Sequence, residues 1–123
     1  MMTKLFGILV GVLALALCHA SGVHAHAFLD HADPRVGSTV RTAPTQIKIW
    51  YTENLEPAFS MIQVVNEAGQ RVDKGDNQVD PSTPDMLRIS VSPLSPGTYK
   101  VIWRVLSVDT HVTEGDFTFR VGP

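Results

Sequence analysis

Apolar and polar residues alternate with a period of two along most of the chain after Thr45. Side chains of a β-strand point alternately to its two faces, so this pattern is typical of strands that bury one face. No stretch of a dozen residues shows the spacing of an amphipathic helix with end caps. The predicted core-facing residues are Ile47, Ile49 and Tyr51; Ile62 and Val64; Leu87, Ile89 and Val91; Tyr99, Val101, Trp103 and Val105; and Phe117, Phe119 and Val121. The chain is therefore predicted to be all-β.

Turn-forming residues separate these segments. Asn66–Gly69 suits a hairpin loop, and residues 73–85, rich in Asp, Gly and Pro, are predicted to form a polar connection. The segment Leu94–Tyr99 delivers a tyrosine to the start of a long strand, which resembles the tyrosine corner of immunoglobulin-like sandwiches. We predict a small Greek-key β-sandwich that forms a single domain.

The first 25 residues have a different character. Lys4 precedes an almost uninterrupted apolar stretch, Leu5–Cys18, and small residues and histidines follow. This order is typical of a cleaved secretory signal peptide, because the apolar stretch is shorter than the roughly 20 residues that span a membrane. A membrane anchor is one alternative. A lipoprotein is another, although Leu17 stands where its motif needs a small residue.

The cleavage position is open, because three small-residue frames overlap: Cys18-His19-Ala20, Val23-His24-Ala25 and Ala25-His26-Ala27. We expect cleavage after Ala25, which leaves residues 26–123 as the exported domain with His26 first. Cys18 is the sole cysteine, so the exported domain would form no disulfide. A net charge of -2 without a Lys or Arg run also argues against nucleic-acid binding.

Three histidines follow the expected cleavage site, and one has an acid two residues before it. In an extended backbone Asp109 and His111 would point to the same side, with Cβ atoms about 7 Å apart. The pair could converge on a metal ion, although a solvated loop gives the same pattern. If His26 is the N-terminus, its α-amine and imidazole add two nitrogen donors. Three nitrogens and one oxygen suit the tetragonal preference of Cu(II). Otherwise His26 is simply the frayed start of a domain.

Taken together, these segments resemble the CopC family of periplasmic copper-binding proteins. The resemblance spans residues 26–123 and rests on His26-Ala27, Asp33-Pro34, Ile47–Glu53, Leu94–Tyr99, Trp103–Val105, and Asp109-Thr110-His111 before Gly115–Phe119. It implies a cupredoxin-like sandwich in the periplasm that binds one Cu(II) through His26, Asp109 and His111. Glu53 matches an acidic residue that the family places near this site, and a solvated loop acid is the equally open alternative.

The methionines depart from part of the family pattern. Some members hold Cu(I) in a methionine-rich loop, whereas Met61 and Met86 are the two methionines here after the leader, each at the start of a predicted strand. A dedicated Cu(I) site is therefore not expected. His31 matches no family role and is expected on the surface.

We expect a non-enzymatic Cu(II) carrier for sequestration, tolerance or delivery, and the resemblance implies a CopD-type inner-membrane copper protein as its partner. Copper monooxygenases also use an N-terminal histidine chelate, but they need an open axial position and a broad substrate surface. A metal-free sandwich that acts only as an interaction module is the third possibility. No membrane insertion is expected after cleavage.

Overall fold

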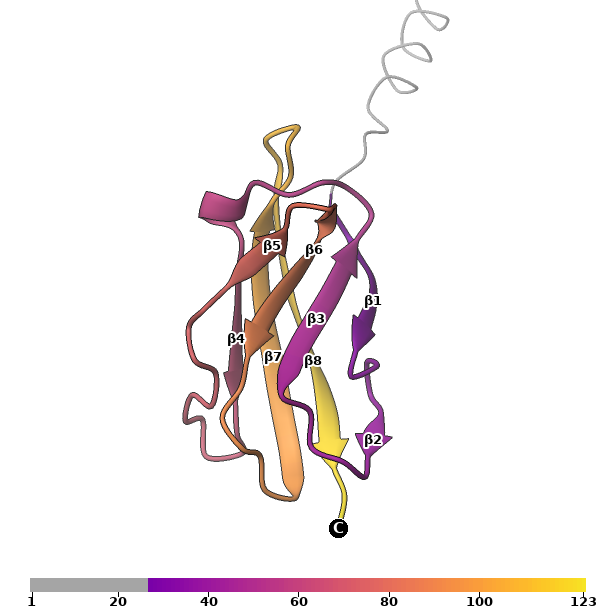
Figure 1. Cartoon of the computed structure of the whole chain (residues 1–123), viewed down its shortest axis with the longest axis vertical. Helices are drawn as coiled ribbons and strands as arrows, with labels where there is room; N and C mark the ends of the chain where they lie inside the picture. The colour runs from indigo at the N-terminus through magenta and orange to yellow at the C-terminus, as the bar shows by residue number, and fades with distance from the viewer. Residues whose placement is uncertain (1–26) are drawn as a thin grey trace, which may run out of the picture.

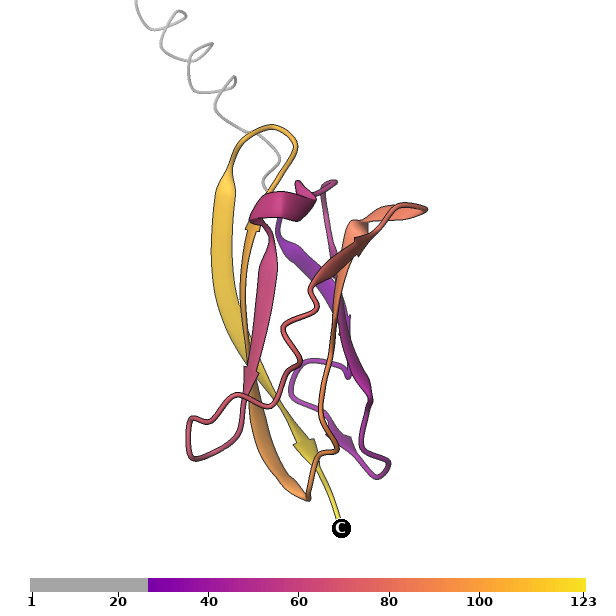
Figure 2. The ribbon, with the colours of Figure 1, turned by 60° about the vertical axis from the view of Figure 1, so that its left-hand side comes forward.

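The computed structural model describes residues 27–123, which form two four-stranded sheets packed face to face (Figure 1; the two layers separate in Figure 2). The first sheet has the order β1-β3-β6-β5, with β1 at Leu29–Asp33, β3 at Gln46–Tyr51, β5 at Gln78–Asp80 and β6 at Thr83–Ser90. The second has the order β2-β8-β7-β4, with β2 at Thr39–Val40, β4 at Met61–Val65, β7 at Gly97–Leu106 and β8 at Val112–Val121. A short 3-10 turn, η1, covers Pro57–Phe59. The predicted all-β sandwich is confirmed.

The core consists of the inward-facing residues of both sheets. Every core-facing residue predicted from the alternation is buried, from Ile47 to Val121. Each buried aliphatic or aromatic side chain stabilises the fold by about 1.5–3 kcal/mol. On β8, Gly115 pairs with Trp103, and a Cβ atom there would lie 2.6 Å from Trp103 Cζ2. Glycine at this position therefore leaves room for the indole ring.

The predicted tyrosine corner is present at one end of the sandwich. Tyr99 is buried near the start of β7, and its hydroxyl donates a hydrogen bond to the carbonyl of Ser95 at 2.6 Å. This bond ties the approach loop to the long β7–β8 ladder, which pairs residues from Gly97↔Val121 to Leu106↔Val112.

Two sequence-based expectations about local structure are wrong. The region 73–85 is not wholly a connection, because it contains β5 and the first residues of β6, where Val79 pairs with Leu87 in the core. Met86 is the fourth residue of β6, not its first, and it is buried. β1 and β2 were not predicted from the alternation of apolar and polar residues.

Polar side chains cover the outer edge of β4. Ile62 N donates to Asn77 Oδ1 at 2.7 Å, and Asn77 Nδ2 donates to the carbonyl of Ile62 at 3.3 Å. Two residues on, Val64 N donates to Asp73 Oδ2 at 2.8 Å and the carbonyl of Val64 accepts from Val72 N at 2.9 Å. The segment 72–77 thus replaces the missing neighbour strand without being a strand itself.

The predicted leader, residues 1–25, and the predicted first residue of the exported domain, His26, lie outside the described residues. Within residues 27–123, no helix has the length and apolar character to cross a membrane.

Candidate metal centre

Among the described residues, Glu53, Asp109 and His111 lie at one end of the sandwich, which we call the turn end: residues 27–30, 52–60, 80–85 and 104–114 (Figure 1). Thr52 N donates to the carbonyl of Phe28 at 2.9 Å, and Phe28 N donates to Thr52 Oγ1 at 3.0 Å. Two residues later, the carbonyl of Asn54 accepts from Val108 N at 3.0 Å. The loop after β3 therefore links the start of the described chain to the β7–β8 turn.

Asp109 and His111 lie together as predicted, although the backbone between them forms a turn and not the extended chain that the prediction assumed. His111 Nδ1 is 3.4 Å from Asp109 Oδ2, and both side chains are partly exposed. Two donors about 2 Å from one metal ion, at angles between square and tetrahedral, lie roughly 3 Å apart. The two atoms thus need only a small adjustment to share an ion.

Backbone geometry holds the two side chains on the same side of the turn. Thr110, between them, has a φ of 71°, in the left-handed region that disfavours β-branched residues. Its N–H donates to the carbonyl of Ser107 at 2.9 Å, which closes the turn. Strained residues of this kind cost about 1–3 kcal/mol and are concentrated at functional sites.

Ser107 is a residue of this turn that the sequence analysis missed. It is fully buried, its hydroxyl donates to Asp109 Oδ1, and it accepts a hydrogen bond from His111 N at 3.3 Å. A polar residue that continues the inward-facing series of β7, two residues before an acid, was the signal that could have found it.

The described chain begins beside the same turn. Ala27 is fully buried, and its carbonyl accepts a hydrogen bond from Thr113 Oγ1 at 2.6 Å. Thr113 is the second residue of β8 and two residues after His111, so residue 27 is anchored at the start of β8. Within residues 27–123, no three His, Cys, Asp or Glu side chains are grouped to hold a metal ion. His26, the remaining predicted ligand, lies outside the described residues.

Glu53 lies on the linking loop between Thr52 and Asn54, and it is half-buried. Its backbone is therefore held beside the turn through the hydrogen bonds of its two neighbours. The structure brings Asp109 and His111 together and places the Glu53 segment at the same end.

His31 lies on the surface, as expected. Its side chain is 59% exposed on β1, its Nδ1 is 2.7 Å from Asp30 Oδ2, and its ring stacks on Trp50 with centroids 4.4 Å apart. Met61 is exposed on β4 and Met86 is buried on β6, in opposite sheets.

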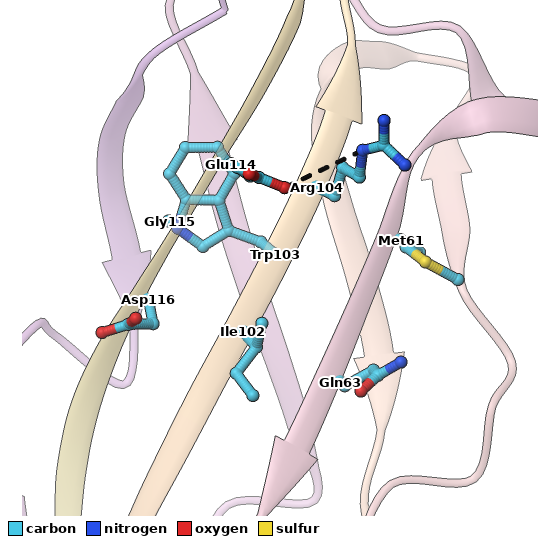
Figure 3. A pocket seen from close by; sticks show the side chains of 8 residues that line it. All are labelled: Met61, Gln63, Ile102, Trp103, Arg104, Glu114, Gly115 and Asp116. Atoms are coloured by element: carbon cyan, nitrogen blue, oxygen red, sulfur yellow. Dashed lines mark ion pairs between the residues drawn. The ribbon is translucent and has the colours of Figure 1, made fainter.

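A hollow on the outer face of the second sheet lies near the turn end but holds none of the predicted ligands (Figure 3). Its walls include Met61, Ile102 and Asp116, and across it Arg104 Nε is 3.9 Å from Glu114 Oε2. This exposed pair contributes little to stability.

Comparison with known proteins identifies the family. The model of the CopC domain family matches residues 29–122. Copper resistance protein C of Pseudomonas syringae pv. tomato is 36% identical over 120 residues, which cover 91% of this chain and 93% of that protein. The crystal structure of CopC from Methylosinus trichosporium OB3b superposes with a TM-score of 0.75 and 34% identity, covering 80% of this chain and 95% of that one.

A third relative is much longer than this chain. The copper transport protein CutJ of Bacillus subtilis is 28% identical over 99 residues, which are 80% of this chain but 18% of CutJ. The family model and the first relative cover most of this chain, and the residues that the family model matches include all the strands and the Asp109–His111 turn. The chain belongs to the CopC family.

Proposed function

We propose that this protein binds one Cu(II) ion in the periplasm, and that the ligands are the α-amine and imidazole of His26, the Asp109 carboxylate and the His111 imidazole. Cleavage after Ala25 creates the amine. In this role the protein is a carrier and not an enzyme: it sequesters copper for tolerance or passes it on.

The observation that supports this proposal is the meeting of two chain segments at the turn end. Asp109 Oδ2 and His111 Nδ1 are 3.4 Å apart, and Thr113, on the next strand, holds the carbonyl of Ala27. Residue 26 directly precedes this anchored residue in the sequence, which supports the proposal that His26 supplies the remaining donors. One carboxylate oxygen and three nitrogens then form a donor set that suits Cu(II).

Glu53 has a supporting part in this proposal. The Thr52 and Asn54 hydrogen bonds hold it between the first described residues and the turn. A carboxylate at that place would stabilise the added positive charge of the bound ion without ligating it.

The oxidation state follows from the donors. Cu(I) favours thioether and thiolate sulfur. In the described chain, Met61 is exposed on one sheet while Met86 is buried in the other, so the two thioethers do not form a common site. We therefore expect Cu(II) binding without a comparably strong Cu(I) site.

The partner would be a membrane copper protein of the CopD type. CutJ, named a copper transport protein, carries a segment similar to this chain within a much longer polypeptide. A domain that is joined to a transport protein in one organism can act beside one as a separate chain in another. Copper delivery to, or receipt from, such a protein is therefore the proposed use of the site.

The test combines mass spectrometry with copper titration of the exported protein. The mass should correspond to residues 26–123, and one equivalent of Cu(II) should give a tetragonal electron paramagnetic resonance spectrum with nitrogen coupling. A variant with one extra Met before His26 should bind Cu(II) much more weakly, because the chelating amine is displaced.

His31→Ala is the matched control, since that histidine is exposed and stacks on Trp50 away from the turn. It should leave the spectrum unchanged. An exported chain that begins at Phe28, or equal binding by the extended variant, would contradict the proposed ligand set.

A further inference from the structure

Ser107 occupies a core-facing position that a hydroxyl normally does not favour. It continues the inward-facing series of β7 that ends in Trp103 and Val105, and its side chain is fully buried. Burial of a hydroxyl costs free energy unless the group is hydrogen-bonded. An alanine would fill this position about as well, so the role of the serine is to be sought in the hydrogen bonds of its hydroxyl.

All the hydrogen bonds of the Ser107 hydroxyl stay within the turn that carries the proposed ligands. The oxygen accepts from His111 N at 3.3 Å, lies 3.2 Å from the carbonyl of His111, and contacts Asp109 Oδ1. A hydroxyl has one hydrogen to donate. Because the carbonyl of His111 already accepts from Ser107 N at 3.0 Å, we assign that hydrogen to the Asp109 carboxylate, the stronger acceptor.

This bond orients the carboxylate. With Oδ1 held inward by Ser107, Oδ2 is directed toward His111 Nδ1, 3.4 Å away. The same hydroxyl fixes the backbone of His111 through its N–H. One buried atom thus positions both side chains before a metal ion arrives.

We propose that Ser107 is the positioning residue of the copper site, which presents Asp109 to the ion through one oxygen and sets its distance from His111. This inference rests on the proposed function, since it assumes that the pair binds Cu(II). Groups that orient metal ligands typically contribute 10–100-fold to metal affinity.

The test compares Cu(II) affinity between Ser107→Ala and Ser60→Ala, measured by competition with a chromophoric chelator. Ser60 is a matched control: it is also buried at the turn end, donates to the carbonyl of Glu56 at 2.8 Å and accepts from Leu106 N at 3.2 Å. Its hydrogen bonds involve no proposed ligand. We expect Ser107→Ala to weaken binding roughly tenfold or more. Ser60→Ala should stay within about twofold of wild type, because its bonds are purely structural.

A double-mutant cycle separates positioning from general loosening of the turn. In an Asp109→Ala background, Ser107→Ala should have a much smaller further effect on affinity, because the carboxylate that it orients is gone and only its bond to His111 N remains. Ser107→Thr keeps the donor and should retain most of the affinity, whereas Ser107→Val, of the same shape, should not. This second pair tests the inference even if Ser107→Ala folds poorly.

Three results would overturn the inference: Cu(II) affinity of a folded Ser107→Ala protein within twofold of wild type, the same loss in the Asp109→Ala background, or equal affinities for the Thr and Val variants. These results leave the proposed function intact as long as wild type binds Cu(II). A wild-type exported protein that binds no Cu(II) would overturn both.

Discussion

The two ends of the sandwich are built in different ways. At the end that carries the tyrosine corner, which we call the corner end (residues 35–41, 66–76, 92–100 and 118–123), short-range bonds set the turns. Tyr99 bonds to a carbonyl four residues earlier, and Asn66 Oδ1 accepts from Gln70 N, also four residues away. At the turn end the decisive bonds are long-range: Thr113 reaches Ala27 across 86 residues, and Phe28 reaches Thr52 across 24. Short-range bonds thus shape the individual turns of the corner end, although Gly37 N also donates to the distant carbonyl of Thr118 there. At the turn end, long-range bonds join the start of the described chain to the loop after β3 and to β8.

Charge separates the two ends as well. At the turn end acidic residues outnumber basic ones: Asp30, Glu53, Glu56, Asp80, Asp85, Asp109 and Glu114 against Arg104. At the corner end basic residues outnumber acidic ones: Arg35, Arg41, Arg71, Lys74, Lys100 and Arg120 against Glu67, Asp73 and Asp76. A negative potential at the turn end raises the local concentration of cations there. If the proposed copper site is correct, the turn end binds the ion and the corner end stabilises the fold, and the following changes test this division of roles.

The largest effect is expected from His111→Ala. Loss of an imidazole donor should weaken Cu(II) binding by more than about a hundredfold, beyond the range for residues that only orient ligands. The free energy of unfolding without copper should change by less than about 0.5 kcal/mol, because the side chain is partly exposed. Chelator competition and urea unfolding measure the two quantities. A large loss of stability without loss of Cu(II) affinity would contradict the assignment of metal binding to the turn end.

The converse change is Asp73→Asn at the corner end. Burial raises the pKa of Asp73, but hydrogen bonds from Arg71 and from the N–H groups of Val64 and Gly75 outweigh it, so the pKa lies below its ordinary value. A depressed carboxyl pKa stabilises the fold above the unfolded-state pKa of about 3.9, and this contribution disappears as pH falls through the native pKa.

Asp73→Asn should therefore lower the free energy of unfolding by about 2 kcal/mol at pH 7, because the side chain is fully buried and its bonds are charge-assisted. The difference from wild type should shrink as pH falls below about 4. Urea unfolding at both pH values tests this, with the exposed Asp116→Asn as control. A stability difference between variant and wild type that grows on acidification would contradict this prediction. A changed Cu(II) affinity would contradict the view that the corner end acts on stability alone.

Thr113→Val should have an intermediate effect. It removes the hydroxyl that holds the Ala27 carbonyl while keeping the side-chain shape. Stability should fall by about 1 kcal/mol, the contribution of one neutral hydrogen bond. Cu(II) affinity should fall several-fold, because residue 26 is then less well placed. Thr118→Val, an exposed position of the same strand, should alter neither.

The smallest expected effect is kinetic. Glu56→Gln removes one negative charge from the turn end and should lower the association rate constant for Cu(II) about twofold at low salt, and less at higher salt, where charges are screened. Stopped-flow measurement with Glu67→Gln at the corner end as control checks this. Equal rates for both variants would show that the charge asymmetry does not steer the ion.

The same contrast explains what could be predicted from the sequence. The core strands were predictable because alternation requires no knowledge of neighbours, and the corner because Tyr99 and Ser95 are close in sequence. β1 was not, since its buried Ala32 is flanked by exposed Asp and His residues and gives no alternation. β5 was not predicted because it follows a polar segment, in which Asp73 and Asn77 accept hydrogen bonds from the backbone of β4.

For the candidate site, the Asp-x-His spacing predicted that Asp109 and His111 would lie close together, and they do. The predicted reason was wrong, because a turn with Thr110 in the left-handed region brings them together in place of an extended backbone. The roles of Thr113 and Ser107 could not be predicted in this way. Thr113 donates a hydrogen bond to a residue 86 positions away, which no local pattern indicates. Ser107 stands at a core-facing position of β7, and its role follows only from its hydrogen bond to Asp109.

The covered edge of β4 has a consequence for the behaviour of the protein in a crowded compartment. An open strand edge offers free N–H and C=O groups to any extended chain, and this is a common route to edge-to-edge aggregation. Here the four outward-facing backbone groups of Ile62 and Val64 are already paired with Asn77, Asp73 and Val72. An incoming strand would have to displace side chains that the fold holds in place. Along this edge the protein is thus protected from self-association without an additional strand, and Asn77→Ala should expose that route.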